Sequence, residues 1–295
     1  MKKLIKRTIK ISSVVLGVLT VLILFLAQSC SSATYNLKDS KMEKINSSKN
    51  YREGKFKNEA TNPGLNYFKM IPMLWEVIFK DNDRKPKIKL PMQKVDFTQI
   101  TNTKPNELKT TWVGHSSQII NIDGKIILTD PIYSNSTAFM GPSRYNGNVP
   151  LEINDLPEID IVLISHNHYD HLNIETIKKI HSKVKLFFTP LAVGAELEKA
   201  GVPREKIIEL DWWDEFNIDD NFKIAFTPTQ HFSGRAIFDN EKTLWGSYVL
   251  IGQYHKVYFS GDSGYFKGFK EIGEKYGPFD LILLECGAYN KDWHY

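Results

Sequence analysis

Short apolar runs separated by turn residues predict a series of strands from about Thr110 onward. Residues 111–113, 117–122 and 125–129 come first, and Asp123-Gly124 between the last two runs is typical of a hairpin turn. Residues 159–164 are almost continuously apolar, as in a strand covered on both faces. Further strands are expected at residues 185–188, 222–226, 256–259 and 279–284.

Helical patterns lie between these later strands. Asn173 is a suitable N-cap for a helix with Ile174, Ile177 and Ile180 on one side. Residues 191–200, followed by Gly201, and residues 267–276 predict two more helices. Hairpins dominate the first part of this region, and strands alternate with helices in the second. This order predicts an α/β (α+β) domain with mixed sheets and helices packed outside.

The first 30 residues have the pattern of an export signal. A 17-residue apolar stretch at 11–27 follows five basic residues, Lys2, Lys3, Lys6, Arg7 and Lys10. Their charges favour a cytoplasmic N-terminus and an exported body. Residues 26–30 resemble a bacterial lipoprotein processing site ending at Cys30, and the alternative is an uncleaved signal anchor in which Cys30 has no role. Both interpretations predict a membrane-associated protein with its body on the extracytoplasmic side.

Residues 31–109 are expected to connect this anchor, residues 1–30, to a domain that covers residues 110–295. The polar residues 31–57 predict a flexible tether or a loosely attached arm. Residues 62–79 are rich in large apolar side chains, which pack on the protein's own domain or, as a functional alternative, face lipid beside an active site. Residues 80–105 are charged and interrupted by proline, which predicts a connecting loop.

Composition and charge exclude several classes of function. A hydrophobic content of 42% is ordinary for a globular protein and excludes a disordered chain. The net charge is +4, but residues 1–60 hold 12 Lys and Arg against 4 Asp and Glu, whereas the remainder holds 26 against 30. This slightly acidic body argues against a nucleic-acid partner. The two cysteines, Cys30 and Cys286, supply no thiolate zinc site, so metal chemistry has to use His and carboxylates.

Three histidines and an aspartate lie within six residues, directly after the apolar run at 159–164. These are His166, His168, Asp170 and His171. In an extended loop the side chains of His166 and His168 project to the same side and can hold one ion, while Asp170 and His171 can hold another. A solvated polar loop is the alternative, but clustered histidines repel one another when protonated. The motif therefore favours a site for two metal ions.

Further ligands are expected at the ends of other strands on the same edge. His231 follows the strand predicted at 222–226, and Asp262 follows the strand predicted at 256–259. A packed core histidine and an Asx turn are the alternatives for these two positions. Because a carboxylate can bridge two ions, Asp262 could complete both coordination spheres.

Several segments together resemble a known family between about Thr110 and Trp293. They resemble the metallo-β-lactamase superfamily and, within it, the N-acyl-phosphatidylethanolamine-hydrolysing phospholipase D family, at residues 111–116, 128–131, 165–172, 209–213, 226–231, 244–247 and 277–281. The resemblance implies an αββα sandwich with a two-zinc site between its sheets.

The resemblance also implies a role for each site residue. His166, His168 and His231 would hold the first zinc, Asp170 and His171 the second, and Asp262 would bridge them, with Asp170 and Asp262 as the catalytic carboxylates. Tyr169 matches a tyrosine that contacts substrate, and Asp130 would orient a ligand imidazole. For His115, an ordinary buried histidine and a similar supporting role remain open.

The chain departs from the family pattern after residues 287–289. In the family, a further histidine ligand of the second zinc and another substrate-contacting histidine follow this segment, whereas this chain ends at Tyr295. We therefore expect a sandwich without its C-terminal strands and helix, and a second zinc that lacks one ligand. His294 does not align with either histidine, and solvated positions are expected for His181 and His255.

The implied activity is hydrolysis of a membrane phospholipid phosphodiester by a metal-bound hydroxide. Two zinc ions give the site a net positive charge, which favours an anionic substrate such as an N-acyl-phosphatidylethanolamine. Iron or manganese could replace zinc. The alternatives are a lactonase or other carbonyl hydrolase of the same fold, a non-catalytic remnant, and a nucleic-acid-processing enzyme, which the acidic body disfavours.

Overall fold

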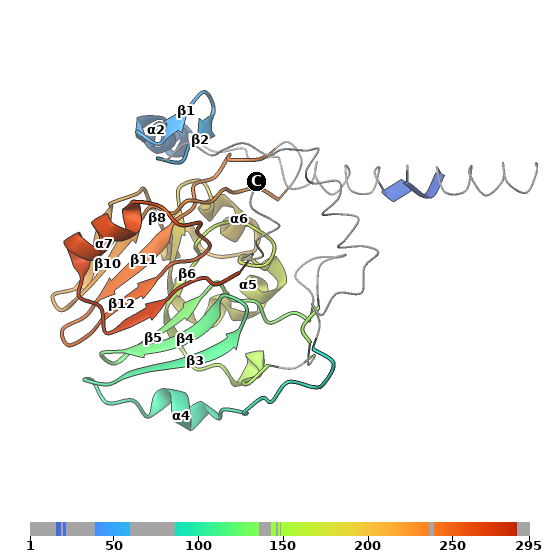
Figure 1. Ribbon diagram of the computed structural model, residues 1–295, viewed down its shortest axis with the longest axis vertical. Coiled ribbons are helices and arrows are strands. Elements are labelled where there is room, and N and C mark those ends of the chain that lie inside the picture. The colour runs from blue at the N-terminus through green and yellow to red at the C-terminus, as the bar shows by residue number, and fades with distance from the viewer. Residues whose placement is uncertain are drawn as a thin grey trace, which may run out of the picture.

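The computed structural model describes residues 16–18, 20–21, 39–59, 86–135, 143–145, 147, 149–235 and 239–287. Two β-sheets form the body of the described chain (Figure 1). The first has the order β3-β4-β5-β6-β7-β8, with β3 (Leu108–Gly114), β4 (Ser117–Ile122), β5 (Lys125–Thr129), β6 (Ile159–Leu163), β7 (Val184–Pro190) and β8 (Ile207–Leu210). The second has the order β13-β12-β11-β10-β9, with β9 (Glu215–Asp219), β10 (Phe222–Thr227), β11 (Ser247–Ile251), β12 (Lys256–Phe259) and β13 (Leu281–Leu283).

Both sheets are mixed, as the sequence predicts. Strands β3, β4 and β5 pair antiparallel, whereas β5, β6, β7 and β8 pair parallel. In the second sheet β9 to β12 pair antiparallel, and β13 joins β12 in parallel. Because parallel strands end at the same edge, the loops after β5 and β6 lie side by side. The backbone N–H of Asp130, just after β5, donates to the carbonyl of Leu163 at the end of β6.

Alternating side chains along the strands build three apolar layers. Ile120 and Ile122 of β4 face Ile224 and Phe226 of β10, so one cluster fills the space between the sheets. The opposite face of the first sheet packs on α5 (Ile174–Ile180) and α6 (Gly194–Lys199). The opposite face of the second sheet packs on α7 (Gly268–Tyr276). Figure 1 shows these helices on opposite outer sides, which confirms the predicted αββα sandwich.

The N-terminal arm, residues 39–59, differs from the flexible tether that its polar composition predicts. It contains α2 (Asp39–Ser47) and a small hairpin of β1 (Tyr51–Arg52) and β2 (Lys55–Phe56). Ile45 and Phe56 are buried in the cluster between the sheets. The Lys44 ammonium donates to the Glu209 carbonyl at 2.6 Å. The expectation of a tether is therefore wrong for these residues, because two apolar anchors fix them to the body.

Two smaller expectations are also corrected. The charged connecting loop contains a short helix, α4 (Phe97–Thr101), which Asp96 caps and whose Ile100 is buried. The helix predicted at 191–200 begins at Gly194 instead. Its first residues form a turn because the Leu191 N–H donates to the Leu210 carbonyl and the Leu191 carbonyl accepts from Leu244. Single 3-10 turns occur at Ile153–Asp155, His181–Lys183 and Arg204–Lys206.

Several predictions concern residues outside the described part of the chain. These are most of the apolar stretch at 11–27, Cys30, residues 62–79 and His294. None of the helices in the described part of the chain has the length and the apolar composition that a membrane span requires.

Candidate metal centre

The loop between β6 and α5 presents the clustered histidines at the carboxyl edge of the first sheet. It begins with the buried Ser165 and ends where the Asn173 side chain accepts the Thr176 N–H at 2.8 Å and caps α5. Within the loop, the N–H groups of His171 and Leu172 both donate to the His168 carbonyl. This tight turn reverses the chain, so that side chains before and after it approach the same point.

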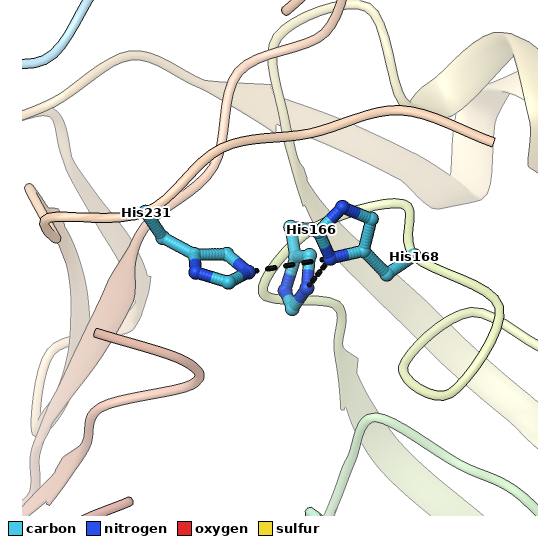
Figure 2. Close-up of side chains that lie close together, drawn as sticks. All are labelled: His166, His168 and His231. Atoms are coloured by element: carbon cyan, nitrogen blue, oxygen red, sulfur yellow. Dashed lines mark hydrogen bonds between the residues drawn. The ribbon is translucent and has the colours of Figure 1, made fainter. Parts of the chain in front are cut away.

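Three histidines from two sheets meet in the first cluster. His166 and His168 come from the loop after β6, and His231 comes from the loop after β10 (Figure 2). His166 Nε2 lies 2.8 Å from His168 Nδ1, and His231 Nε2 lies 3.2 Å from the same atom. The three ligand nitrogens all lie within 4.8 Å of one another. The structure therefore brings together three residues that are separated by up to 65 positions in the sequence.

The electrostatics of this cluster suit a cation. Burial, together with the neighbouring histidines, lowers the pKa of His166 well below its ordinary value. Burial also lowers the pKa of His168 to about 4 and that of His231 to about 3. All three rings are neutral at pH 7, which is the form that binds metals. Converging nitrogen lone pairs repel one another unless a proton or a cation lies between them, so the donor set fits a zinc-like ion.

Two further groups of possible ligands share His171. One joins it to His115 and Asp170, and the other joins it to His166 and Asp262. The Nε2 of His171 lies 3.2 Å from Asp262 Oδ1, and the other Asp262 oxygen lies 3.7 Å from His231 Nε2. One Asp262 oxygen thus faces His171 and the other faces His231, which suits a bridging carboxylate. Burial alone would raise the pKa of Asp170, but its hydrogen bond with His115 and the charge of His171 outweigh burial and lower it.

Asp130 holds the ring of His171 from behind. It is fully buried, and one oxygen lies 2.7 Å from His171 Nδ1 while accepting the Ser165 hydroxyl at 2.6 Å. Its other oxygen accepts the Ser165 N–H at 2.7 Å. Burial would lower the pKa of His171, but its hydrogen bonds with Asp130 and Asp262 raise it well above the ordinary value. This arrangement leaves His171 Nε2 facing the cluster.

The other two predicted site residues are His115, which belongs to a ligand group with Asp170 and His171, and Tyr169. His115 is 51% exposed, so the alternative of an ordinary buried histidine is wrong. Its Nε2 lies 3.2 Å from Asp170 Oδ2 and 3.2 Å from His171 Nε2. The Tyr169 ring lies 4.0 Å from the guanidinium carbon of Arg235, which fixes the ring's orientation.

Sequence reasoning missed the clamp formed by Asn167, Glu196 and Arg235. Arg235 pairs with Glu196 at 3.3 Å and donates to the carbonyls of Asn167 and Leu172 at 2.9 and 2.8 Å. The Asn167 amide in turn donates to Glu196 at 3.0 Å. The arginine and glutamate side chains are buried, so the clamp holds both ends of the histidine loop. Only the position of Asn167 inside the motif could have drawn attention to it.

A cavity of about 740 Å³ opens beside His115 and Asp170. Its wall is largely apolar and includes Leu90, Met92, Val95, Trp112 and Val113. Arg144 also lines it and donates to the backbone carbonyls of Val113, Ile132 and Ser134.

The other two histidines of the described chain, His181 and His255, lie away from the ligand groups. His181 follows α5 at its C-terminal end. His255 lies in the turn between β11 and β12, where its Nδ1 is 2.6 Å from Asp123 Oδ1. Neither belongs to the ligand groups found among the described residues.

Comparisons with known proteins place this geometry in a family. A family model described as a beta-lactamase superfamily domain matches residues 125–295. An uncharacterized protein of Mycobacterium tuberculosis is 38% identical over 252 residues, which cover 83% of this chain and 66% of that protein. The N-acyl-phosphatidylethanolamine-hydrolyzing phospholipase D 1 of Caenorhabditis elegans is 32% identical over 255 residues, or 81% of this chain and 70% of that enzyme.

A solved structure, Igni18, described as a metallo hydrolase from Ignicoccus hospitalis, shares 25% sequence identity with a TM-score of 0.42, over 57% of this chain and 66% of Igni18. This chain spans 66% of the length of the mycobacterial relative. The match to more than half of the chain, together with the identity to the nematode enzyme, shows that this protein belongs to the metallo-β-lactamase superfamily of metal-dependent hydrolases.

Proposed function

We propose that this hydrolase cleaves the phosphodiester bond of an N-acyl-phosphatidylethanolamine-like membrane phospholipid, in the manner of a phospholipase D. The observation that carries the proposal is the pair of ligand clusters joined by Asp262, next to a cavity that is mainly apolar. The relationship to the nematode enzyme supports it, because that relative is named for this reaction.

In this proposal each cluster holds one ion. His166, His168 and His231 would hold the first, Asp170 and His171 would contribute to the second, and Asp262 would contribute to both. Bound ions of this type lower the pKa of water and stabilise charge on attacked and leaving oxygens. Asp130 keeps the His171 ring in place through its 2.7 Å hydrogen bond. Zinc is the proposed metal, because neutral imidazoles and carboxylates are its usual ligands where no cysteine takes part.

The cavity supports a substrate with an anionic group and apolar chains. Its volume of about 740 Å³ lies in the range typical of ligand sites. Leu90, Met92 and Trp112 offer apolar surface for acyl chains, and the positive charge of Arg144 favours a phosphate nearby. Tyr169, held by Arg235, is proposed to contact the substrate. The export signal predicted at residues 1–30 would keep the enzyme at a membrane surface that contains its substrate.

The first test is the metal content of the full chain, measured by elemental mass spectrometry. Wild type is expected to contain about two ions, and His168→Ala at least one fewer. His255→Ala is the matched control, since it removes a histidine outside the clusters. Wild type without metal would refute the proposed centre and favour a non-catalytic remnant.

The second test compares substrates. Release of the head group from N-acyl-phosphatidylethanolamine in mixed micelles is expected, with loss of activity in His168→Ala and retention in His255→Ala. Opening of lactones without phosphodiester cleavage, by a metal-loaded protein, would refute the phospholipase proposal and favour the carbonyl hydrolase alternative.

A further inference from the structure

The side chain of Asn58, in the N-terminal arm, is bonded to both polar backbone groups of His231. Asn58 Nδ2 donates to the His231 carbonyl at 2.7 Å. Asn58 Oδ1 accepts the His231 N–H at 3.3 Å. The two residues are 173 positions apart in the sequence. One amide therefore pairs with the backbone of His231 as a neighbouring strand would.

The indole of Trp245 fixes which way this amide faces. Trp245 Nε1 lies 3.1 Å from Asn58 Oδ1 and 3.1 Å from the Thr229 carbonyl oxygen. Because an indole N–H can only donate, the atom of Asn58 that faces it has to be the oxygen. The amide nitrogen then points to the His231 carbonyl, so the geometry allows one orientation and not its flipped form. Trp245 is fully buried, which keeps its N–H in place.

The arm is tied to the same loop at several other points. The Phe56 N–H donates to the Glu241 carbonyl at 2.8 Å, and the Lys242 ammonium donates to the Gly54 carbonyl at 2.8 Å. The Lys55 ammonium lies 3.4 Å from the Glu241 carboxylate. With Phe56 buried in the core, these contacts hold Asn58 against the loop between β10 and β11, which carries His231.

We propose that Asn58 is a positioning residue that sets the orientation of His231 in the metal centre. The inference rests on the proposed role of His231 as a ligand of the first ion. His231 lies beyond the end of β10, one residue past the isolated bridge between Gln230 and Gly264, where the pairing of β10 with β11 has already ended. The two hydrogen bonds from the Asn58 amide restrain the His231 backbone as a neighbouring strand would, and they hold it where its imidazole contacts His168.

Loss of this amide is expected to weaken metal binding rather than abolish folding. Groups that orient metal ligands typically change affinity about 10- to 100-fold when they are removed. Asn58→Ala removes the donor and the acceptor together. Asn58→Asp keeps the size and the acceptor but places an oxygen against the His231 carbonyl oxygen, and it supplies a second variant in case Asn58→Ala does not fold. Both variants are expected to bind the first ion at least about 10-fold more weakly than wild type.

Asn50→Ala is the matched control. Asn50 belongs to the same arm, and its amide donates to Asp211 Oδ1 at 3.0 Å, so its removal also costs one contact between arm and body. Asn50 belongs to none of the ligand groups found in the described part of the chain, and its amide bonds Asp211 instead of a proposed ligand. Asn50→Ala is therefore expected to leave metal affinity within about two-fold of wild type, as is usual for surface changes away from such a site.

The experiment is a titration of the full metal-free chain with Co²⁺, followed by its visible absorption, for wild type and the three variants. The supporting result is a dissociation constant for the first ion raised at least about 10-fold in both Asn58 variants but not in Asn50→Ala. Equal affinities in all four proteins, or an equal loss in Asn50→Ala, would overturn the role of Asn58. A wild-type chain that binds no Co²⁺ would instead overturn the proposed metal centre.

Discussion

Replacing Phe56 with alanine tests whether the N-terminal arm is part of the folded body. Phe56 has 0% exposure and packs between the two sheets, with the Tyr51 ring 4.9 Å away. Transfer of a buried phenylalanine side chain from water contributes about 1.5–3 kcal/mol, and the cavity left by its removal adds to this loss. Phe56→Ala is therefore expected to lower the free energy of unfolding by about 3–5 kcal/mol.

The assay is equilibrium unfolding in urea, followed by tryptophan fluorescence in the presence of a chelator, so that metal binding does not contribute. With a slope of about 3 kcal/mol per molar urea, the expected loss moves the midpoint down by about 1–1.7 M. Phe97→Ala is the control, because that side chain is 47% exposed, and it is expected to change stability by less than about 1 kcal/mol. An effect of Phe56→Ala as small as that of the control would refute the packing argument and restore the flexible tether.

Further predictions concern two glycines, the aspartate behind His171 and the aspartate that binds the turn between β11 and β12. Gly246→Ala would place a Cβ 2.6 Å from a backbone oxygen of β10 and is expected to lower the free energy of unfolding by about 1–3 kcal/mol. Gly273→Ala lies in open space on α7 and should raise the free energy of unfolding by up to about 1 kcal/mol. Thermal melts in which Gly246→Ala is the more stable variant would contradict both expectations. Asp130→Asn should weaken binding at the second ion about 10- to 100-fold in a Co²⁺ titration, and unchanged affinity would argue against its role in orienting His171. Asp123→Ala removes three hydrogen bonds to the turn between β11 and β12 and should lower the urea midpoint of unfolding. A midpoint shift as small as that of an exposed substitution would contradict a stabilising role for these bonds.

The local part of the site was predictable from the sequence. His166, His168, Asp170 and His171 lie within one loop, so their proximity follows from chain geometry alone. The positions of His231 and Asp262 followed from the rule that loops at one edge of a sheet converge. The family resemblance supplied the αββα arrangement, which the layers of buried side chains confirm.

The contacts between distant segments were not predictable. In the N-terminal arm, Ile45 and Phe56 are isolated apolar residues in a polar background, so no helical or strand period marks them as buried. Asn58 meets His231 only because the arm crosses the loop after β10, and nothing in its local sequence distinguishes it from a solvated asparagine. Arg235 acquires its role in the same way, through partners on other elements.

The division of the proposed ligands between the two sheets has a consequence for how the protein becomes active in the cell. Four of these side chains come from the loop after β6 in the first sheet, whereas His231 and Asp262 come from loops of the second sheet. Neither half would bind an ion at full strength alone, so tight metal binding would require both sheets to be packed together. Because a ligand that binds only the native state stabilises it, metal supply would set the lifetime of the newly made chain against proteases. Metal starvation would then reduce the amount of this enzyme as well as its activity.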